Sequence, residues 1–422
     1  MKVFKFGGGV LKSSKDIVRL GDILKENDGE NIIVVVSAFN KITSKFEDLI
    51  NAFFSVKKIE ETIFNEIKSF HFSLAKDLFD DINYYSIELK LKKLFDEILD
   101  IFNNGLTNDY HFEYDKIVSY GELLSSTIVY EFLKLKNINC SFKDSRNLIV
   151  TNSDYTEAKV DWELSGKRIK EECDFNENNI YISQGFVAAD NNGNTTTLGR
   201  EGSDFTASVF GYVFDADEVV FWKEVDGIYN SDPAISSDYE LLPKLSYKES
   251  VEQAYYGAKI LHPKTIKPLQ NKKIPIVVKS FYKNNDGTSI IDISDLSPDL
   301  YPDIPIFIVK DNQILISVST LDFSFISEHN LGEIFSLLSK YRIKVNLMQS
   351  SAINFSVCVT NNKFKVPKFI SELKKTFKVL YNDDLSLITI RHYNNIAIKK
   401  MIANRKILLE QKSRHTVRFV VR

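Results

Sequence analysis

Cysteine and histidine are scarce in this sequence, and their positions exclude cross-links and the usual metal sites built from side chains. The three cysteines, Cys140, Cys173 and Cys358, are spread over 422 residues. An odd number of cysteines so far apart indicates neither a disulfide framework nor a Cys-x-x-Cys metal site. The six histidines form no close pair with metal-ligand spacing. We therefore expect reduced, buried thiols in a cytoplasmic protein and no metal held by side chains.

Long apolar runs are absent as well. The segment from Met1 to Gly7 has no apolar core of the kind found in signal peptides, and no run approaches the length of a membrane span. The 54 basic and 57 acidic residues nearly cancel, so that the net charge is −3. This balance favours neither nucleic acid nor a membrane surface as a partner. A chain of this length can form two or three domains.

The N-terminal segment has the pattern of a strand, a glycine loop, a helix and a buried strand. The run from Lys2 to Phe6 is followed by three glycines, an amphipathic helix begins near Ser13, and Asn31 to Val36 is apolar. This order indicates a parallel α/β sheet. The glycines match neither Gly-x-Gly-x-x-Gly nor Gly-x4-Gly-Lys-Ser/Thr, so both the dinucleotide fingerprint and the P-loop are excluded. Two interpretations remain, a sharp turn or a phosphate cradle with Lys5 as its cation.

The stretch from Thr195 to Thr206 is the densest group of polar and small residues in the chain. It lies between an apolar strand pattern and a helical pattern and contains two glycines, Arg200 and Asp204. A helix that begins near Ser203 would direct its free N–H groups and its positive dipole end toward an anion. The guanidinium group of Arg200 fits a carboxylate or a phosphate. The alternative is a plain capped loop with Ser203 or Asp204 as the N-cap.

Residues 44 to 136 have a mostly helical pattern, and Glu122 is their most informative member. Small residues surround Glu122, with apolar neighbours on both sides. We expect this carboxylate to be half buried and to need a partner. A structural ion pair with a core arginine and a functional role are both open. Further on, a polar loop from Lys223 to Pro233 follows a strand pattern, at the place where open α/β sheets bind ligands.

The C-terminal part of the chain has a different organisation. Three prolines fall among polar residues between Thr288 and Pro305, which we interpret as a linker. Beyond it, the pattern from Ile314 to residue 375 predicts strand, helix, strand, strand and helix, and Val379 to Tyr381 closes the unit. Residues from Leu385 to Val421 look like a second, shorter copy. This order is typical of a small α+β regulatory module that is present about twice.

Taken together, these stretches resemble the aspartokinases, which are amino-acid kinases with C-terminal ACT domains. The resemblance implies an amino-acid kinase fold, a mostly parallel sheet sandwiched by helices, over residues 1–290. It implies an ACT-type α+β regulatory region over residues 305–422, with the second ACT unit shortened. The matching motifs are Lys5 to Gly8, Val36 to Ala38 with Thr43, Val118 to Leu123, Thr196 to Asp204, Val225 to Pro233, and Gly257 to Pro263.

The resemblance implies ATP-dependent phosphorylation of the L-aspartate side chain to 4-phospho-L-aspartate, the first step of the lysine, threonine and methionine branch of biosynthesis. The acceptor carboxylate is ionised at neutral pH and needs no general base, so the site should be rich in cations and N–H groups. The implied roles are as follows: Lys5 and Asp204 are catalytic; Ser37, Ala38, Thr43, Glu122, Arg200 and Ser203 bind aspartate; and Lys5, Gly7, Gly8, Gly9, Lys223, Glu224, Tyr229, Asp232, Lys259 and Ile260 bind ATP.

The resemblance also implies Mg²⁺ carried mainly by the nucleotide phosphates, a homodimer, and an amino-acid effector at the ACT units. Two alternatives stay open. A kinase of glutamate or acetylglutamate is one, although Glu122 argues against an acetylated amine because such a group has no charge to pair. A non-catalytic amino-acid sensor is the other, although intact Lys5, Arg200 and Asp204 argue against it.

The sequence departs from the family pattern at several places. Glu201 stands where a second glycine is usual, and Ala234 stands where an arginine is common. Asn346 and Ala352 match positions that carry acidic residues in lysine-inhibited members. Because an ammonium group needs a charged partner, we expect lysine inhibition to be weak or absent.

Overall fold

The computed structural model describes residues 1–235, 238–258, 260–292, 304–322 and 324–422. The chain forms two compact units. The first unit comprises Met1–Ile228, Leu242–Val251 and Leu261–Ser297, and the second comprises Tyr229–Leu241, Glu252–Ile260 and Pro298–Arg422. Two short segments of the expected range 1–290 thus pack with the second unit.

Contacts with residues far along the chain explain why these two segments join the second unit. The backbone N–H of Phe307 donates to the carbonyl oxygen of Asn230 at 2.7 Å. The guanidinium group of Arg391 lies 3.4 Å from Glu252. These partners are distant in sequence, so a domain boundary predicted from local composition does not reveal the contacts between them.

The first unit is built on an eight-stranded sheet in the order β3-β5-β2-β1-β8-β10-β11-β9. Its strand pairs are parallel except for the antiparallel pair β10–β11. The fold class predicted from the N-terminal pattern is therefore confirmed. The strands are β1 (Lys2–Phe6), β2 (Ile32–Val36), β3 (Cys140–Phe142), β5 (Ile180–Gln184), β8 (Glu218–Lys223), β9 (Lys244–Ser246), β10 (Ile276–Ser280) and β11 (Thr288–Ile291).

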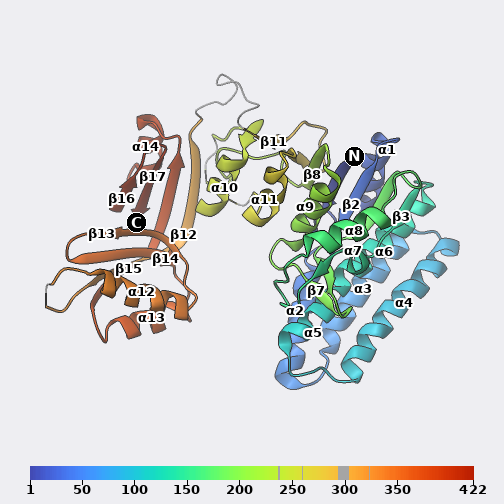
Figure 1. The fold of residues 1–422 in the computed structure, drawn as a ribbon, viewed down its shortest axis with the longest axis horizontal. Coiled ribbons are helices and arrows are strands. Elements are labelled where there is room, and N and C mark those ends of the chain that lie inside the picture. Colours follow the sequence, from blue (N-terminus) through green and yellow to red (C-terminus); the bar gives the residue numbers. More distant parts are fainter. Residues whose placement is uncertain (236–237, 259, 293–303, 323) are drawn as a thin grey trace. The chain divides into compact units, whose positions relative to one another are not determined.

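Helices cover both faces of this sheet (Figure 1). On β2, the alternate residues Ile32, Val34 and Val36 belong to one large core cluster, whereas Ile33 and Val35 are equally buried but face away from it. Helix α9 packs on β1, β2 and β8, and α6 packs on β2 and β5. The helices are α1 (Ser14–Glu26), α2 (Ile42–Val56), α3 (Glu61–Leu78), α4 (Asp81–Asn103), α5 (Tyr110–Val118), α6 (Tyr120–Leu135), α7 (Ser145–Leu148), α8 (Trp162–Glu172), α9 (Gly202–Phe214), α10 (Tyr247–Tyr256, which reaches into the second unit) and α11 (Pro263–Asn271).

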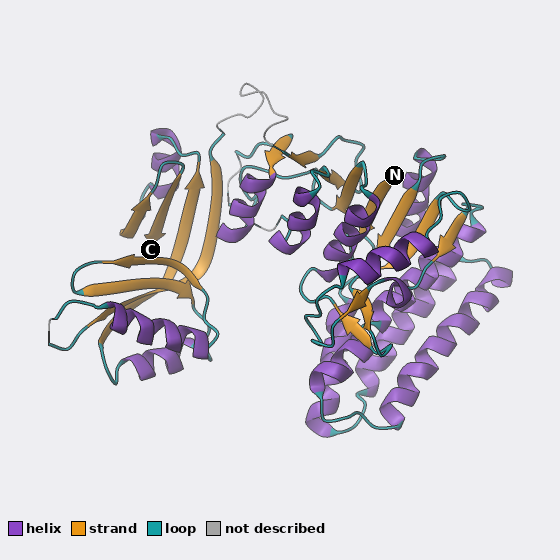
Figure 2. Cartoon of the chain, in the orientation of Figure 1, coloured by secondary structure: helices purple, strands orange, loops and turns teal. Residues whose placement is uncertain are grey.

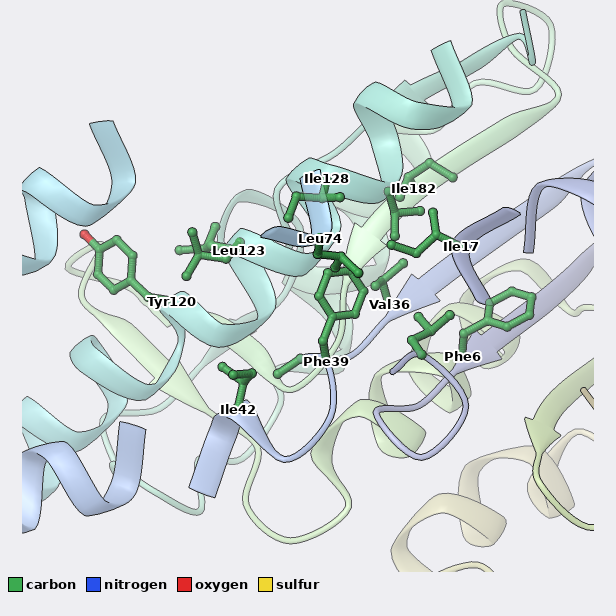
Figure 3. Close-up of a cluster of buried hydrophobic side chains, with 14 of the residues drawn as sticks. Phe6, Ile17, Val36, Phe39, Ile42, Leu74, Tyr120, Leu123, Ile128 and Ile182 are labelled. Atoms are coloured by element: carbon green, nitrogen blue, oxygen red, sulfur yellow. The ribbon is translucent and has the colours of Figure 1, made fainter. Parts of the chain in front are cut away.

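The predicted helical block is confirmed as α2 to α6, and it extends the core of the sheet. Phe39, Ile42 and Leu74 from this region lie in one cluster with Phe6 and Val36 of the sheet (Figure 3). A small separate sheet, β4 (Val150–Thr151), β6 (Val187–Asp190) and β7 (Thr195–Thr197), carries the threonine-rich stretch. Within the described ranges, no helix is long and apolar enough to cross a membrane.

The helical block contains a buried histidine, His71, in α3. Its Nδ1 lies 2.7 Å from the carbonyl oxygen of Ile67, and Nε2 has no hydrogen-bond partner in the described part of the chain. The rings of Phe39, Phe70 and Phe95 surround it at centroid distances of 6.2, 5.3 and 6.0 Å. Burial lowers the pKa of His71 from 6.5 to about 4. The imidazole is therefore neutral in the folded chain at neutral pH.

This histidine should make folding sensitive to mild acid. Below pH 6.5 the unfolded chain binds a proton at His71 that the folded chain refuses until about pH 4, so stability is complete above pH 6.5 and falls on acidification. We expect a loss of about 3 kcal/mol between pH 7 and pH 4 from this group. Urea unfolding of the wild type and of His71→Phe at both pH values measures the difference. His111→Phe, on the exposed surface of α5, is the control and should behave as the wild type does.

The second unit is an antiparallel sheet in the order β13-β14-β12-β15-β17-β16 (Figure 2). Helices α12 and α13 cover one core cluster, and α14 covers another. The elements are β12 (Ile306–Ser319), α12 (Glu328–Lys340), β13 (Val345–Ser350), β14 (Asn354–Thr360), α13 (Val366–Leu373), β15 (Lys378–Arg391), α14 (Asn395–Ile402), β16 (Ile407–Lys412) and β17 (Thr416–Val421).

Two features of this sheet differ from the sequence-based expectation. The segments 379–381 and 385–391, expected as the end of one copy and the start of the next, are a single strand, β15. Its partner β12 is also longer than expected, and the two pair over most of their length with a register shift near Gln313. The two predicted copies therefore share one sheet, because both long strands run through it.

Candidate functional site

The carboxyl ends of the central parallel strands meet at one edge of the large sheet. Phe6 pairs with Val36 and with Trp222, and Val36 pairs with Gln184. The residues that follow these strands must therefore emerge side by side: the glycine loop, the segment from Ser37, and Lys223 with Glu224. This is the edge at which parallel α/β sheets bind their ligands.

Asp204, in the first turn of α9, joins two lysines from different strands. Its Oδ1 lies 2.6 Å from Nζ of Lys5 on β1, and its Oδ2 accepts a hydrogen bond from Nζ of Lys223 at 3.1 Å. The side chains of Lys5 and Asp204 are 8 % and 4 % exposed, whereas Lys223 is 30 % exposed. One carboxylate thus fixes two ammonium groups at the strand edge.

The charges in this triad are not equivalent. Burial raises the pKa of Asp204, but the ammonium groups of Lys223 and Lys5 outweigh burial and hold it at about 2. Burial lowers the pKa of Lys5, with help from the nearby charge of Lys223. Two cations and one anion leave an excess of positive charge at this edge, which suits an anionic ligand.

The glycine loop packs closely against the neighbouring strand end. A Cβ atom on Gly8 would lie 2.5 Å from the carbonyl oxygen of Ala38, and one on Gly7 would lie 2.8 Å from Nζ of Lys5. The N–H groups of Gly8 and Gly9 make no hydrogen bond to any described residue. The turn interpretation and the cradle interpretation are therefore compatible, since the tight turn leaves amides beside the Lys5 cation.

The threonine-rich stretch leads directly into α9. The helix begins at Gly202, and Glu201 before it adopts a left-handed conformation with φ of 54°. The suggested N-cap at Ser203 or Asp204 is wrong, because both residues lie inside the first turn and are buried. A Cβ atom on Gly185 would lie 2.6 Å from that of Ser203, so the helix start packs tightly against the end of β5.

The left-handed conformation at Glu201 gives a physical reason for the glycine expected there. Non-glycine residues adopt this conformation at a cost, whereas glycine does so freely. Glu201 is held in place by its Oε2, which accepts a hydrogen bond from the backbone N–H of His262 at 2.8 Å. Arg200 is exposed and makes no hydrogen bond or ion pair with the residues that the structure describes.

Glu122, in the first turn of α6, is buried without a counter-ion. Its Oε1 lies 3.4 Å from the backbone N–H of Ala38, and Oε2 has no partner among the described residues. The hydroxyl group of Thr43 also hydrogen-bonds to it. Burial raises the pKa of Glu122 to about 8, and the nearby charge of Lys5 only moderates this rise. Within the described ranges, no arginine neutralises Glu122, so the ion pair with a core arginine that the sequence left open is not found there.

The structure brings the predicted site residues together only in part. Lys5, Gly7, Gly8, Ala38, Thr43, Glu122, Asp204 and Lys223 are linked by the contacts above. Glu224 lies near Gly9 and pairs with Lys12. Ser37 continues from the end of β2, and its N–H donates to the carbonyl oxygen of Phe6. Tyr229, Asp232 and Ile260 belong to the second unit, and Lys259 lies outside the described residues.

Sequence reasoning missed Asp115, the carboxylate that holds the threonine-rich stretch. Its carboxylate accepts hydrogen bonds from the N–H and hydroxyl groups of Thr197, at 2.8 and 2.6 Å, and from the N–H of Thr156. Asp115 is fully buried on α5. Small and apolar neighbours marked Glu122, whereas Asp115 stands between Glu113 and Lys116 in the sequence and carries no such signal.

The chain is similar to a known protein family and to several known proteins. The model of the amino acid kinase family matches residues 1–280. The chain is 30 % identical over 424 residues to the bifunctional aspartokinase/homoserine dehydrogenase of Buchnera aphidicola, covering 96 % of this chain and 50 % of that protein. It is 26 % identical over 400 residues to lysine-sensitive aspartokinase 3 of Escherichia coli, covering 92 % of this chain and 86 % of that one. The crystal structure of Clostridium acetobutylicum aspartate kinase matches with a TM-score of 0.82 at 25 % identity, covering 100 % of this chain and 96 % of that one.

The coverage of these matches is uneven. The chain spans about half the length, or slightly less, of the bifunctional relatives that it matches. It spans 86 % of lysine-sensitive aspartokinase 3 and 96 % of the Clostridium acetobutylicum aspartate kinase.

Proposed function

Because the chain belongs to the amino acid kinase family, we propose that it transfers the γ-phosphoryl group of ATP to the side-chain carboxylate of L-aspartate. The product would be 4-phospho-L-aspartate, the first intermediate of the lysine, threonine and methionine branch. The observation that carries this proposal is the pair of ammonium groups that Asp204 fixes at the strand edge, close to the uncompensated carboxyl group of Glu122. Relatives named as aspartokinases support the same substrate.

The reaction requires electrostatic stabilisation of the transferred phosphoryl group rather than a general base. A carboxylate oxygen of aspartate forms a bond to the γ-phosphorus, the bond from that phosphorus to the β,γ-bridging oxygen breaks, and ADP leaves with the electron pair. No proton is removed, since the acceptor is already ionised. Lys5 and the amides of Gly7, Gly8 and Gly9 would stabilise the charge on the moving phosphoryl group. Asp204 would orient Lys5 and Lys223 and would take no part in proton transfer.

The aspartate would lie between the threonine-rich stretch and the segment after β2. Arg200 is exposed and would pair with an aspartate carboxylate through its planar fork. Glu122 would meet the substrate ammonium group, which supplies the missing counter-ion. The remaining contacts would come from Ser37, Ala38, Thr43 and Ser203.

The nucleotide would contact Lys223 and Glu224 at the end of β8. Tyr229, Asp232, Lys259 and Ile260 are proposed as further ATP-binding residues from the family resemblance alone. The described residues contain no cluster of three His, Cys, Asp or Glu side chains fit to hold a metal ion. We propose from the family resemblance that a Mg²⁺ ion is held mainly by the phosphates, where it would neutralise charge during the transfer. We also propose catalytic and ACT-type regulatory regions at 1–290 and 305–422, an amino-acid effector, and a homodimer.

The test is a hydroxylamine trap for the acyl phosphate. Purified chain is incubated with ATP, Mg²⁺ and hydroxylamine together with L-aspartate, L-glutamate or N-acetyl-L-glutamate. Hydroxamate should form with aspartate alone. Formation with either of the other acceptors in preference to aspartate would assign a sibling kinase, and no hydroxamate with any acceptor would favour a non-catalytic sensor.

Binding of aspartate should release a proton from Glu122. With a pKa of about 8, Glu122 is mostly protonated at pH 7, and a substrate ammonium group would drive it to the ionised form. Calorimetric titration at pH 7, without ATP, in buffers of different ionisation enthalpy should show nearly one proton released per aspartate. At pH 9 the release should nearly vanish, because Glu122 is then mostly ionised while the α-amino group of aspartate is still mostly protonated.

The variant Glu122→Gln should abolish this proton release and weaken aspartate binding by about tenfold or more. Glu113→Gln is a matched control, since Glu113 is also buried and its Oε2 accepts no hydrogen bond from the described residues, with Nζ of Lys116 4.0 Å away. If Glu122→Gln still releases the proton, the ammonium contact assigned to Glu122 is wrong.

A further inference from the structure

The second unit contains a cavity of about 420 Å³ that the proposed reaction does not use. It lies beside strands β13 and β17 and the end of helix α10. Its lining includes Tyr255, Tyr256, Asn346, Met348, Gln411 and Arg418. The volume is within the range of small-ligand sites.

Arg418, on β17, brings a buried positive charge to the wall of this cavity. It is 8 % exposed. Its Nη2 donates to the carbonyl oxygen of Asn346 at 2.7 Å, and its guanidinium carbon lies 4.9 Å from the ring centroid of Tyr256. No carboxylate pairs with Arg418 in the described part of the chain. A buried cation usually has an anionic partner, because desolvation is costly.

Two further cations reinforce this charge. Nζ of Lys310 lies 3.3 Å from Oδ1 of Asn346, and Nζ of Lys344 lies 5.3 Å from the ring centroid of Tyr255. Burial lowers the pKa of Lys310 to about 8, and the charges of Lys344 and Arg418 add to this effect. The positive charges of Lys344 and Arg418 thus repel that of Lys310, and no anion among the described residues lies between them.

The carboxylate of Glu252, which contacts Tyr256 of the lining, does not cancel this excess. Glu252 lies 3.4 Å from Nη1 of Arg391 and also hydrogen-bonds to Tyr256. Its charge is therefore already shared with another arginine. The amide of Asn346 is also engaged, since its Nδ2 donates to Oε1 of Gln313 and to Oγ1 of Thr360. The wall of the cavity therefore offers positive charge and neutral polar groups beside two aromatic rings.

We propose that this cavity binds a small organic anion. Its carboxylate or phosphate oxygens would meet the guanidinium group of Arg418, with Lys310 and Lys344 adding attraction. Its apolar or planar part would lie against Tyr255, Tyr256 and Met348. A cationic ligand is disfavoured, because the three positive groups would repel it. The proposal concerns the second unit alone and stands independently of the proposed kinase activity.

Calorimetric titration of the purified full chain with simple probes tests this site. The probes are phenyl phosphate, benzoate, neutral phenol and cationic L-lysine. At least one of the two anions should bind at least about tenfold more tightly than phenol and L-lysine. The tighter of the two anions identifies the preferred charged group. If neither anion binds more tightly than phenol and L-lysine, the proposal is overturned.

Variants assign the binding to this cavity rather than to the ATP site. Arg418→Gln and Gln411→Glu should each weaken anion binding by about tenfold or more, the first by removing the cation and the second by adding a negative charge at the exposed rim. Lys5→Met should leave this binding intact. Arg405→Gln removes the same charge from an exposed position outside the cavity and should have no effect. Circular dichroism checks folding; if Arg418→Gln unfolds, Gln411→Glu decides, and unchanged anion binding in the folded variants overturns the assignment.

Discussion

Replacing Lys5 with methionine is expected to lower kcat by about 10²–10³-fold or more, because a preorganised cation at the developing charge is lost. The chain should remain folded. Methionine fills a similar volume without a charge, and Asp204 retains Lys223 at 3.1 Å as its partner. The thermal midpoint should therefore change little. Hydroxamate formation with aspartate and ATP measures the rate, and circular dichroism measures the midpoint.

Two comparisons make the Lys5→Met result interpretable. Lys15→Met removes the same charge from an exposed position on α1 and should keep wild-type turnover. Lys223, the other cation bound to Asp204, has a side chain that is 30 % exposed. Replacing Lys223 with methionine should raise the KM for ATP more than it lowers kcat. If Lys5→Met keeps wild-type turnover, the kinase proposal loses its basis, because the proposal assigns the ammonium group of Lys5 to the charge on the moving phosphoryl group.

Replacing Asp204 with asparagine is expected to destabilise the fold as well as to abolish most activity. Two ammonium groups would lose the carboxylate that they share. We expect a loss of about 3 kcal/mol, the low end of the range for a broken buried ion pair, because Lys223 is partly hydrated. Urea unfolding at pH 7 measures this loss. Adding Lys5→Met to Asp204→Asn should recover part of the stability, since one uncompensated cation is removed, but no activity.

The pH dependence provides an independent check on Asp204. Its pKa of about 2 lies below the ordinary value of 3.8, so its stabilising effect is complete above about pH 4 and is lost as the pH falls toward 2. The stability difference between the wild type and Asp204→Asn should therefore shrink over that range. A difference that stays constant down to pH 2 would show that the carboxylate charge is not what holds the two lysines.

The local patterns of the sequence were sufficient to predict the fold class. The apolar run at Ile32–Val36, the serine at position 13 and the amphipathic helix after it are each recognisable within a few residues. Strands that alternate with helices form parallel sheets, and the carboxyl ends of such strands meet at one edge. The positions of Lys5, the glycines and Lys223 at strand ends follow from this rule. The site roles of individual residues stay predictions.

Long-range packing could not be predicted in the same way. Nothing near Asp204 in the sequence shows that its two oxygens meet lysines 199 residues before it and 19 residues after it, because the order of strands decides which ends become neighbours. The continuous strand β15 was divided in two by sequence reasoning, since Asn382 to Asp384 is a typical turn sequence. In the structure Asp384 has a φ of 52° and the register with β12 shifts there, and pairing with β12 on both sides continues the strand.

The sequence by itself determined the type of each element and the chemistry available at its ends, because hydrophobic periodicity and turn residues act over a few residues. The tertiary structure alone decided which charges are compensated. It gave Asp204 two lysines and placed Arg418 beside Tyr256. Among the described residues, it left Glu122 without an ion-pair partner and Arg418 without a carboxylate. These outcomes depend on burial and on partners distant in the chain, and desolvation makes such charges costly unless a ligand completes them.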